Sequence, residues 1–162
     1  MSTYKEQKIT KPKPEDVAGD FLDAEKTAAF LNLVEFIRAN KIGIRWASAN
    51  SWTLNFKSKR LGYLKIHDQY GFWWFCHNHP INNYYSMEEC DLKSFVFDNL
   101  YARDCEKCRI KRSIIDMPKA GVTNQNICAC WPLRVFNPDG EVMEQTKRLI
   151  EYRMKCILEA SK

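Results

Sequence analysis

Four of the seven cysteines in this chain lie in two close pairs within the segment CEKCRIKRSIIDMPKAGVTNQNICAC, residues 105–130. Cys105 and Cys108 form a C-x-x-C motif, and Cys128 and Cys130 form a C-x-C motif further along. A two-residue spacer lets one turn direct both sulfurs at a single ion, and two such pairs complete the tetrahedral thiolate shell of a structural zinc ion. The spacing therefore predicts a structural zinc site made of Cys105, Cys108, Cys128 and Cys130.

The identity of the fourth zinc ligand stays open, because the C-x-C pair is one residue shorter than the usual second half of such a site. In an extended segment Cys128 and Cys130 point to the same side, so both can bind one ion. Otherwise Cys128 binds without Cys130, and the fourth ligand comes from elsewhere. The other candidates are Cys76, His77 and His79 in FCHNH, and Cys90 in MEEC.

Two enzymatic interpretations compete with a structural zinc ion. A redox-active C-x-x-C needs a reactive thiolate, which the neighbouring Lys107 and Arg109 would favour. Metal-dependent hydrolysis would instead use His77 and His79, although surface or loop positions explain both residues better. The chain contains no G-x-S-x-G, H-E-x-x-H, phosphate-binding loop or dinucleotide fingerprint. No catalytic residue is therefore assigned, and cysteines without a joint role remain a further alternative.

The spacing of apolar residues predicts three helices around these motifs. An amphipathic helix starts at the N-cap Asp23 and ends at residues 40–43, because its apolar residues recur at intervals of three and four. A second helix is expected over residues 87–101. The last helix is expected to open with Asn137 as its N-cap and Pro138 at its first position.

Between residues 44 and 76 the apolar residues recur at every second position, which is typical of strands. The breaks SANS, KSKR and DQYG fit tight reversals, and WPLRVF at residues 131–136 adds a short strand. We therefore predict an α+β fold. It consists of an antiparallel meander sheet of about four to five strands, packed by two or three helices, with a cysteine-rich loop.

The domain organisation follows from length and composition. A chain of 162 residues suits one domain. Residues 1–20 alternate Lys with acidic residues and contain Pro12 and Pro14, which predicts a flexible N-terminal tail before a single α+β domain over residues 21–162. No apolar run approaches the roughly 20 residues of a membrane span, and no signal-peptide pattern opens the chain. These features predict a cytoplasmic protein with reduced thiols.

Aromatic residues make up 13% of the chain and are concentrated in the predicted sheet region. Most of them are expected in the core. However, the consecutive residues 72–75 are all aromatic, so a strand there shows two rings to each face and one pair can line a binding surface. The residues predicted to bind a small molecule or a protein partner are Trp46, Trp52, Trp73, Trp74 and Tyr84.

Nucleic acid is not the expected partner. The net charge of +5 is mild, and the basic residues are spread along the sequence. A platform for single strands would combine aromatic and basic side chains. The sequence offers only a weak version of such a platform, in Trp52, Lys57, Lys59, Arg60 and Lys65.

The C-terminal part of the chain resembles a family of small uncharacterised bacterial proteins, common in anaerobic Gram-positive species. The resemblance rests on the C-x-x-C motif, the later Cys128 and the stretch RVFNPDGEVMEQTKRLIEYR, with its Asn-Pro-Asp-x-Glu helix start after a phenylalanine. The stretch SANSWTLNFKSKRLGYLKI also resembles the sheet of small α+β domains of unknown function. The resemblance implies an α+β domain with clustered ligand-like cysteines and no assigned activity. The leading hypothesis is therefore a cytoplasmic, metal-stabilised binding module, with an enzyme as the alternative.

Overall fold

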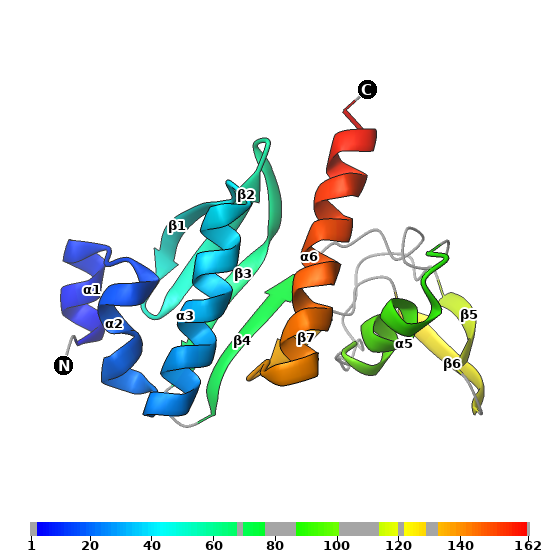
Figure 1. The fold of residues 1–162 in the computed structure, drawn as a ribbon, viewed down its shortest axis with the longest axis horizontal. Coiled ribbons are helices and arrows are strands. Elements are labelled where there is room, and N and C mark those ends of the chain that lie inside the picture. The colour runs from blue at the N-terminus through cyan, green and yellow to red at the C-terminus, as the bar shows by residue number, and fades with distance from the viewer. Residues whose placement is uncertain are drawn as a thin grey trace. The chain divides into compact units, whose positions relative to one another are not determined.

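The computed structural model describes residues 3–67, 70–76, 87–100, 114–119, 122–128 and 133–161 (Figure 1). The chain divides into two compact units, Met1–Phe75 with Val135–Lys162, and Cys76–Arg134. The prediction of a single domain over residues 21–162 stays a prediction. No helix in the described part of the chain is long and apolar enough to cross a membrane.

The larger unit contains a sheet in the order β1-β2-β3-β4-β7 together with helices (Figure 1). Its strands are β1 (Gly43–Ser48), β2 (Ser51–Phe56), β3 (Lys59–His67), β4 (Gly71–Cys76) and β7 (Leu133–Phe136). Its helices are α1 (Tyr4–Thr10), α2 (Pro14–Phe21), α3 (Ala24–Ala39) and α6 (Gly140–Glu159). Strands β1 to β4 pair in antiparallel order as a meander. The predicted α+β fold and its meander sheet are confirmed.

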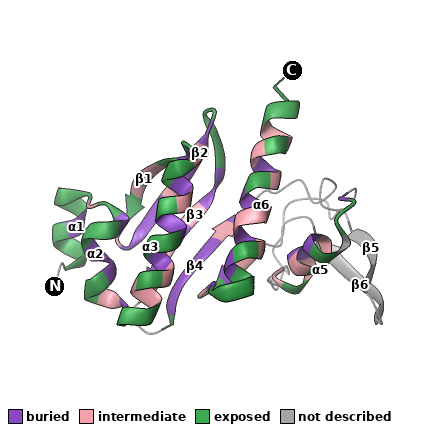
Figure 2. Cartoon of the chain, in the orientation of Figure 1, coloured by how far each residue is buried: buried purple, intermediate pink, exposed green. Residues whose placement is uncertain are grey.

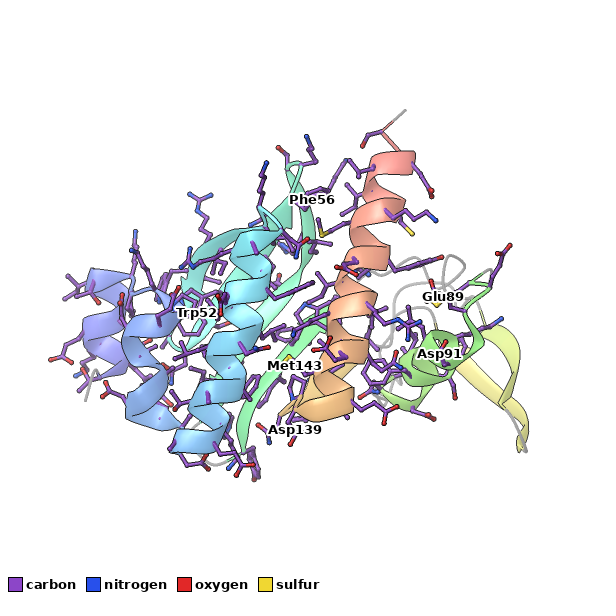
Figure 3. The ribbon with its side chains drawn as sticks, in the orientation of Figure 1. Trp52, Phe56, Glu89, Asp91, Asp139 and Met143 are labelled. Atoms are coloured by element: carbon purple, nitrogen blue, oxygen red, sulfur yellow. The ribbon has the colours of Figure 1, made fainter. Side chains whose placement is uncertain are left out.

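The core of the larger unit lies between one face of this sheet and the helices (Figure 2). Phe30 of α3 is 0% exposed and lies at its centre. Its ring centroid is 5.2 Å from that of Phe72 and 6.3 Å from that of Trp52. Met143 of α6 is also buried and points into the same layer (Figure 3). Burial of these large apolar side chains stabilises the unit, since each fully buried one contributes about 1.5–3 kcal/mol.

The predicted N-cap is correct for one of the long helices and wrong for the other. Asp23 caps α3 as expected, because its carboxylate accepts a hydrogen bond from the Lys26 backbone N–H at 2.8 Å. The last helix, however, has Asp139 as its N-cap (Figure 3), so the prediction of Asn137 at that position is wrong. Asn137 adopts a left-handed conformation with φ of 38°, which places it before the helix.

The side chain of Asn137 instead fastens the connection between β3 and β4. Its Oδ1 accepts a hydrogen bond from the Phe72 N–H at 2.8 Å, and its Nδ2 donates to the Tyr70 carbonyl at 2.8 Å. Gly71 lies between these two residues with φ of 92°. A Cβ there would lie 2.1 Å from Asn137 Oδ1, so only glycine fits beside this amide.

The N-terminal region differs from the predicted flexible tail over residues 1–20, because it forms α1 and α2. Thr3 and Glu6 form a capping box at the start of α1, and Pro14 occupies the first turn of α2. Between the two helices, the Pro12 carbonyl accepts a hydrogen bond from Trp52 Nε1 at 2.8 Å. Composition does not predict the contact of Trp52 with Pro12, because the two residues lie 40 positions apart in the chain.

A buried amide pair also holds α1 against the turn between β1 and β2. Gln7 is 0% exposed, and its Nε2 donates to Asn50 Oδ1 at 2.7 Å. Gln7 Oε1 in turn accepts from the Asn50 backbone N–H at 2.8 Å. The single side chain of Gln7 therefore satisfies two polar groups of a buried turn residue.

We expect Gln7→Ala to lower the free energy of unfolding by about 1–3 kcal/mol, because it leaves the buried Asn50 N–H without its acceptor. Urea unfolding followed by tryptophan fluorescence measures this loss, and amide hydrogen exchange at Asn50 should accelerate. The matched control is Lys8→Ala on the exposed side of the same helix, with a change within about 0.5 kcal/mol. Equal effects of the two substitutions would show that α1 is not held by this pair.

The smaller unit contains α5 (Cys90–Asp98) and a hairpin of β5 (Ile114–Lys119) and β6 (Val122–Cys128). Helix α5 agrees with the helix predicted over residues 87–101, and its Leu92 and Val96 are buried. The hairpin lies inside the segment predicted as a cysteine-rich loop. Apolar and polar residues do not alternate clearly in this segment, so its two strands were not predicted.

Candidate binding face of the sheet

The strand pairing divides the side chains of the larger unit's sheet between two faces. Trp46, Trp52, Leu64 and Trp74 lie opposite one another across β1 to β4 and share the face on which the helices pack. Trp52 is 1% exposed and Trp74 is 0% exposed. These two tryptophans, which were predicted to bind a ligand, therefore belong to the core, whereas Trp46 is half-buried.

Gly62 explains how so large a side chain as Trp74 fits into this face. A Cβ at Gly62 would lie 2.9 Å from Trp74 Nε1 and 2.7 Å from the Phe75 carbonyl oxygen. The indole therefore packs directly against the backbone of β3. This packing fixes β4 so that the alternate residues of the strand, Trp73 and Phe75, point to the opposite face.

That second face, called the polar–aromatic face below, combines rings with cations. In one row Arg45, Thr53, Tyr63 and Phe75 lie opposite one another across four strands. The neighbouring row pairs Lys65 with Trp73. The polar–aromatic face consists of Arg45, Thr53, Asn55, Arg60, Tyr63, Lys65, His67, Tyr70, Trp73, Phe75 and Phe136.

Tyr63 and Phe75 form the first aromatic group on this face. Their rings are stacked, with centroids 4.8 Å apart and an interplanar angle of 12°. The guanidinium of Arg60 lies 5.2 Å from the centroid of Tyr63, and Arg60 Nη1 donates to the Tyr63 hydroxyl at 2.6 Å. A register shift after Leu54 places Arg60 opposite Asn55, and so on the same face as Tyr63. The local sequence thus sets a cation directly over a ring.

Trp73 forms the centre of the second aromatic group. It is 7% exposed, because His67, Phe136 and Lys65 surround it. The ring centroids of His67 and Phe136 lie 5.7 Å and 5.2 Å from the Trp73 centroid, and the Lys65 ammonium lies 5.5 Å from it. Tyr70 adds a further ring 4.8 Å from His67. Tyr70 is 63% exposed and Phe136 is 45% exposed. Trp73 therefore supports the exposed ring of Phe136 more than it offers a surface of its own.

The charge on the sheet has one sign. The five strands contain no Asp or Glu, and their charged residues are Arg45, Lys59, Arg60, Lys65 and Arg134. Arg45 and Arg60 are exposed, and Lys65 is half-buried over the Trp73 ring. Guanidinium and ammonium groups bind anions, while ring faces bind other flat rings. The arrangement is suited to a ligand that carries both a negative charge and an aromatic ring.

The predicted metal site lies mostly outside the described residues. The positions that lie outside are Cys105, Cys108 and Cys130, the candidate ligands His77 and His79, and the predicted binding residue Tyr84. The backbone of Cys128 ends β6 opposite Ile114, Cys90 begins α5, and Cys76 is buried at the end of β4. Within the described ranges no three His, Cys, Asp or Glu residues group as metal ligands. The zinc site stays a prediction.

The sequence did not single out Tyr63, Tyr70, Phe75 and Phe136 as members of the polar–aromatic face. The alternation Tyr63, Lys65, His67 along β3 is visible in the sequence, but its pairing with Phe75 and Phe136 depends on the register of three strands. No protein-family model, curated protein or solved structure matches this chain. The resemblance to a bacterial family therefore stays a prediction, and any functional argument depends on the polar–aromatic face itself.

Proposed function

We propose that this protein is a binding module whose polar–aromatic face holds an anionic ligand with an aromatic ring. The observation that carries the proposal is the placement of Arg60 and Lys65 over the rings of Tyr63 and Trp73, on strands without an acidic residue. Trp73 stays in the proposed site as the residue that packs against the exposed ring of Phe136. Trp52 and Trp74 leave the set of candidate binding residues because they are core.

The strength of such a site follows from its parts. Stacking of one ligand ring on an exposed aromatic side chain contributes about 1–3 kcal/mol. A hydrogen bond between an anion and a cationic side chain contributes about 1.5–3 kcal/mol more. Together these predict a dissociation constant between about 10 mM and 50 µM for a ligand with one ring and one charge. Larger ligands that reach several rings bind more tightly.

The proposal includes a structural zinc ion bound by Cys105, Cys108, Cys128 and Cys130. Its support is the spacing of the cysteines in the sequence. The zinc ion would stabilise the smaller unit, whereas the ligand site belongs to the larger unit. The two parts of the proposal are therefore tested separately.

A suitable probe for the binding face is 8-anilinonaphthalene-1-sulfonate, which carries aromatic rings and one negative charge. We expect saturable binding to the folded protein, and about fivefold or more weakening by Arg60→Ala and by Phe136→Ala, because each loses about 1 kcal/mol or more of contact energy. Fluorescence titration measures the dissociation constants, and circular dichroism verifies that each variant is folded.

Two substitutions away from the polar–aromatic face serve as matched controls for this titration. Lys155→Ala removes an exposed cation of α6, and Tyr4→Ala removes a ring of α1 that is 50% exposed. Both should bind the probe as the parent does. Absence of saturable binding, or equal losses in the controls and the face variants, would contradict the proposed site.

A further inference from the structure

We infer that the ligand of the polar–aromatic face is a single-stranded nucleic acid, an inference that rests on the proposed function. The juxtaposition that supports it is a continuous array of rings and cations along β3 and β4. The array runs from Tyr63 and Phe75, through Lys65 and Trp73, to His67 and Tyr70.

The size of the array exceeds what one small ligand covers. Tyr63, Lys65 and His67 follow one another on the same face of β3, so the array extends about 13 Å along the strand, at about 3.3 Å per residue. Phe136 widens it beyond β4 by its contact with Trp73. Sheets that bind single strands stack two or three bases on rings arranged in this way.

Charge favours a phosphate backbone as the rest of the ligand. Arg45 and Arg60 are exposed near the Tyr63 end of the array, and Lys65 lies in its middle. No acidic residue of the strands opposes a run of negative charges. An acidic peptide would satisfy the cations as well, but bases would in addition stack on the exposed rings of Tyr70 and Phe136, which acidic side chains cannot do.

A double helix fits this face less well than a single strand does. Paired bases are stacked on one another and present only their edges, whereas single strands turn the faces of their bases toward aromatic side chains. On the polar–aromatic face the rings of Tyr70 and Phe136 are 63% and 45% exposed. The geometry therefore selects unpaired bases.

The fold brings together basic residues that are spread along the sequence, and this placement favours nucleic acid. In the sequence, Trp52 was the expected ring of the platform. In the structure Trp52 belongs to the core, but Arg45, Arg60 and Lys65 lie on one face with other rings. Arg45 and Lys65 are 20 positions apart in the sequence, and the strand pairing places both on this face.

The test uses fluorescein-labelled decathymidylate and the full chain in an anisotropy titration. We expect this strand to bind at least tenfold more tightly than thymidine 5′-monophosphate and than a duplex of the same length. If Arg45, Arg60 and Lys65 each neutralise one phosphate, the slope of log affinity against log salt is about −2. Arg45→Ala should reduce that slope by about 0.7.

The ring and charge contributions are separated by variants. Phe136→Ala and Tyr70→Ala should weaken strand binding about fivefold or more, with an unchanged salt slope. Lys155→Ala and Tyr4→Ala, far from the array in sequence, should leave both the affinity and the slope unchanged. Circular dichroism of every variant verifies folding, so a loss of binding is not a loss of structure.

Three outcomes would overturn the inference. They are equal affinity for the duplex, equal affinity for the mononucleotide, and displacement of the strand by decaglutamate at the same concentration as by unlabelled decathymidylate. The last outcome would identify an acidic peptide as the better ligand. Because binding of the anilinonaphthalene probe is measured independently, any of these results can occur while the proposed function itself still holds.

Discussion

Purified protein should contain one zinc ion per chain, and both Cys105→Ser and Cys128→Ser should lose that ion and melt at a markedly lower temperature. The physical reason is the coupling of metal binding to folding, since a structural zinc ion contributes on the order of 10 kcal/mol. Cys105 belongs to the C-x-x-C motif and Cys128 to the later pair, so each variant tests one half of the site. Elemental analysis measures the metal, and thermal unfolding measures the stability.

The control for the zinc prediction is Cys156→Ser, which changes a free and half-buried cysteine of α6. This variant should keep the ion. The same measurement on Cys130→Ser and on Cys76→Ser tests two of the candidate fourth ligands, because only a true ligand releases metal when it is replaced. A metal-free parent protein, with unaltered melting in the Cys105 and Cys128 variants, would refute the site. An excess of a chelator should unfold the smaller unit first if the prediction holds.

Replacing Phe30 with Ala should lower the free energy of unfolding by about 3–5 kcal/mol, because it removes a fully buried ring and leaves a cavity. The lost ring lies between Trp52 and Phe72, so the cavity opens between α3 and two strands of the sheet. For a chain of this size the midpoint of thermal unfolding should fall by on the order of 10 °C. Urea and thermal unfolding give both quantities.

Leu31 offers the matched control for Phe30, because it is the next residue of the same helix and is 37% exposed. Leu31→Ala keeps the helix propensity high and should cost about 1 kcal/mol or less. Similar losses at both positions would mean that α3 does not pack through the Phe30 side as described. Strand binding should survive in Leu31→Ala, since that residue lies on the helix layer.

Local patterns were sufficient to predict the sheet and the long helices. Alternation of apolar residues, interrupted at SANS and KSKR, predicted β1 to β4 because hairpin pairing requires only neighbours in sequence. Asp23 predicted the start of α3 because capping is local. Features that join distant positions were not predicted. The contact of Gln7 with Asn50 is one example, and it converts an apparent tail into docked helices.

The candidate site was predictable only in part, for the same reason. Consecutive aromatic residues in β4 predicted that some rings leave the core, but not which ones. The outcome depends on register, which sends Trp74 over Gly62 and into the core and sends Trp73 to the other face. A count of charges along the chain also cannot show that Arg60 and Lys65 lie on one face of the sheet.

The hydrogen bonds of Asn137 have a consequence for the thermodynamics of recognition. This amide fixes the backbone at Tyr70 and Phe72, and it directly follows Phe136 in the chain. The backbone at Tyr70, in the turn between β3 and β4, is thus tied by one side chain to the end of β7 before any partner arrives. The backbone entropy at these positions is already lost in the free protein, so an incoming molecule meets a smaller ordering cost there. Tightness at this surface would then come from rigidity as much as from the number of atoms touched.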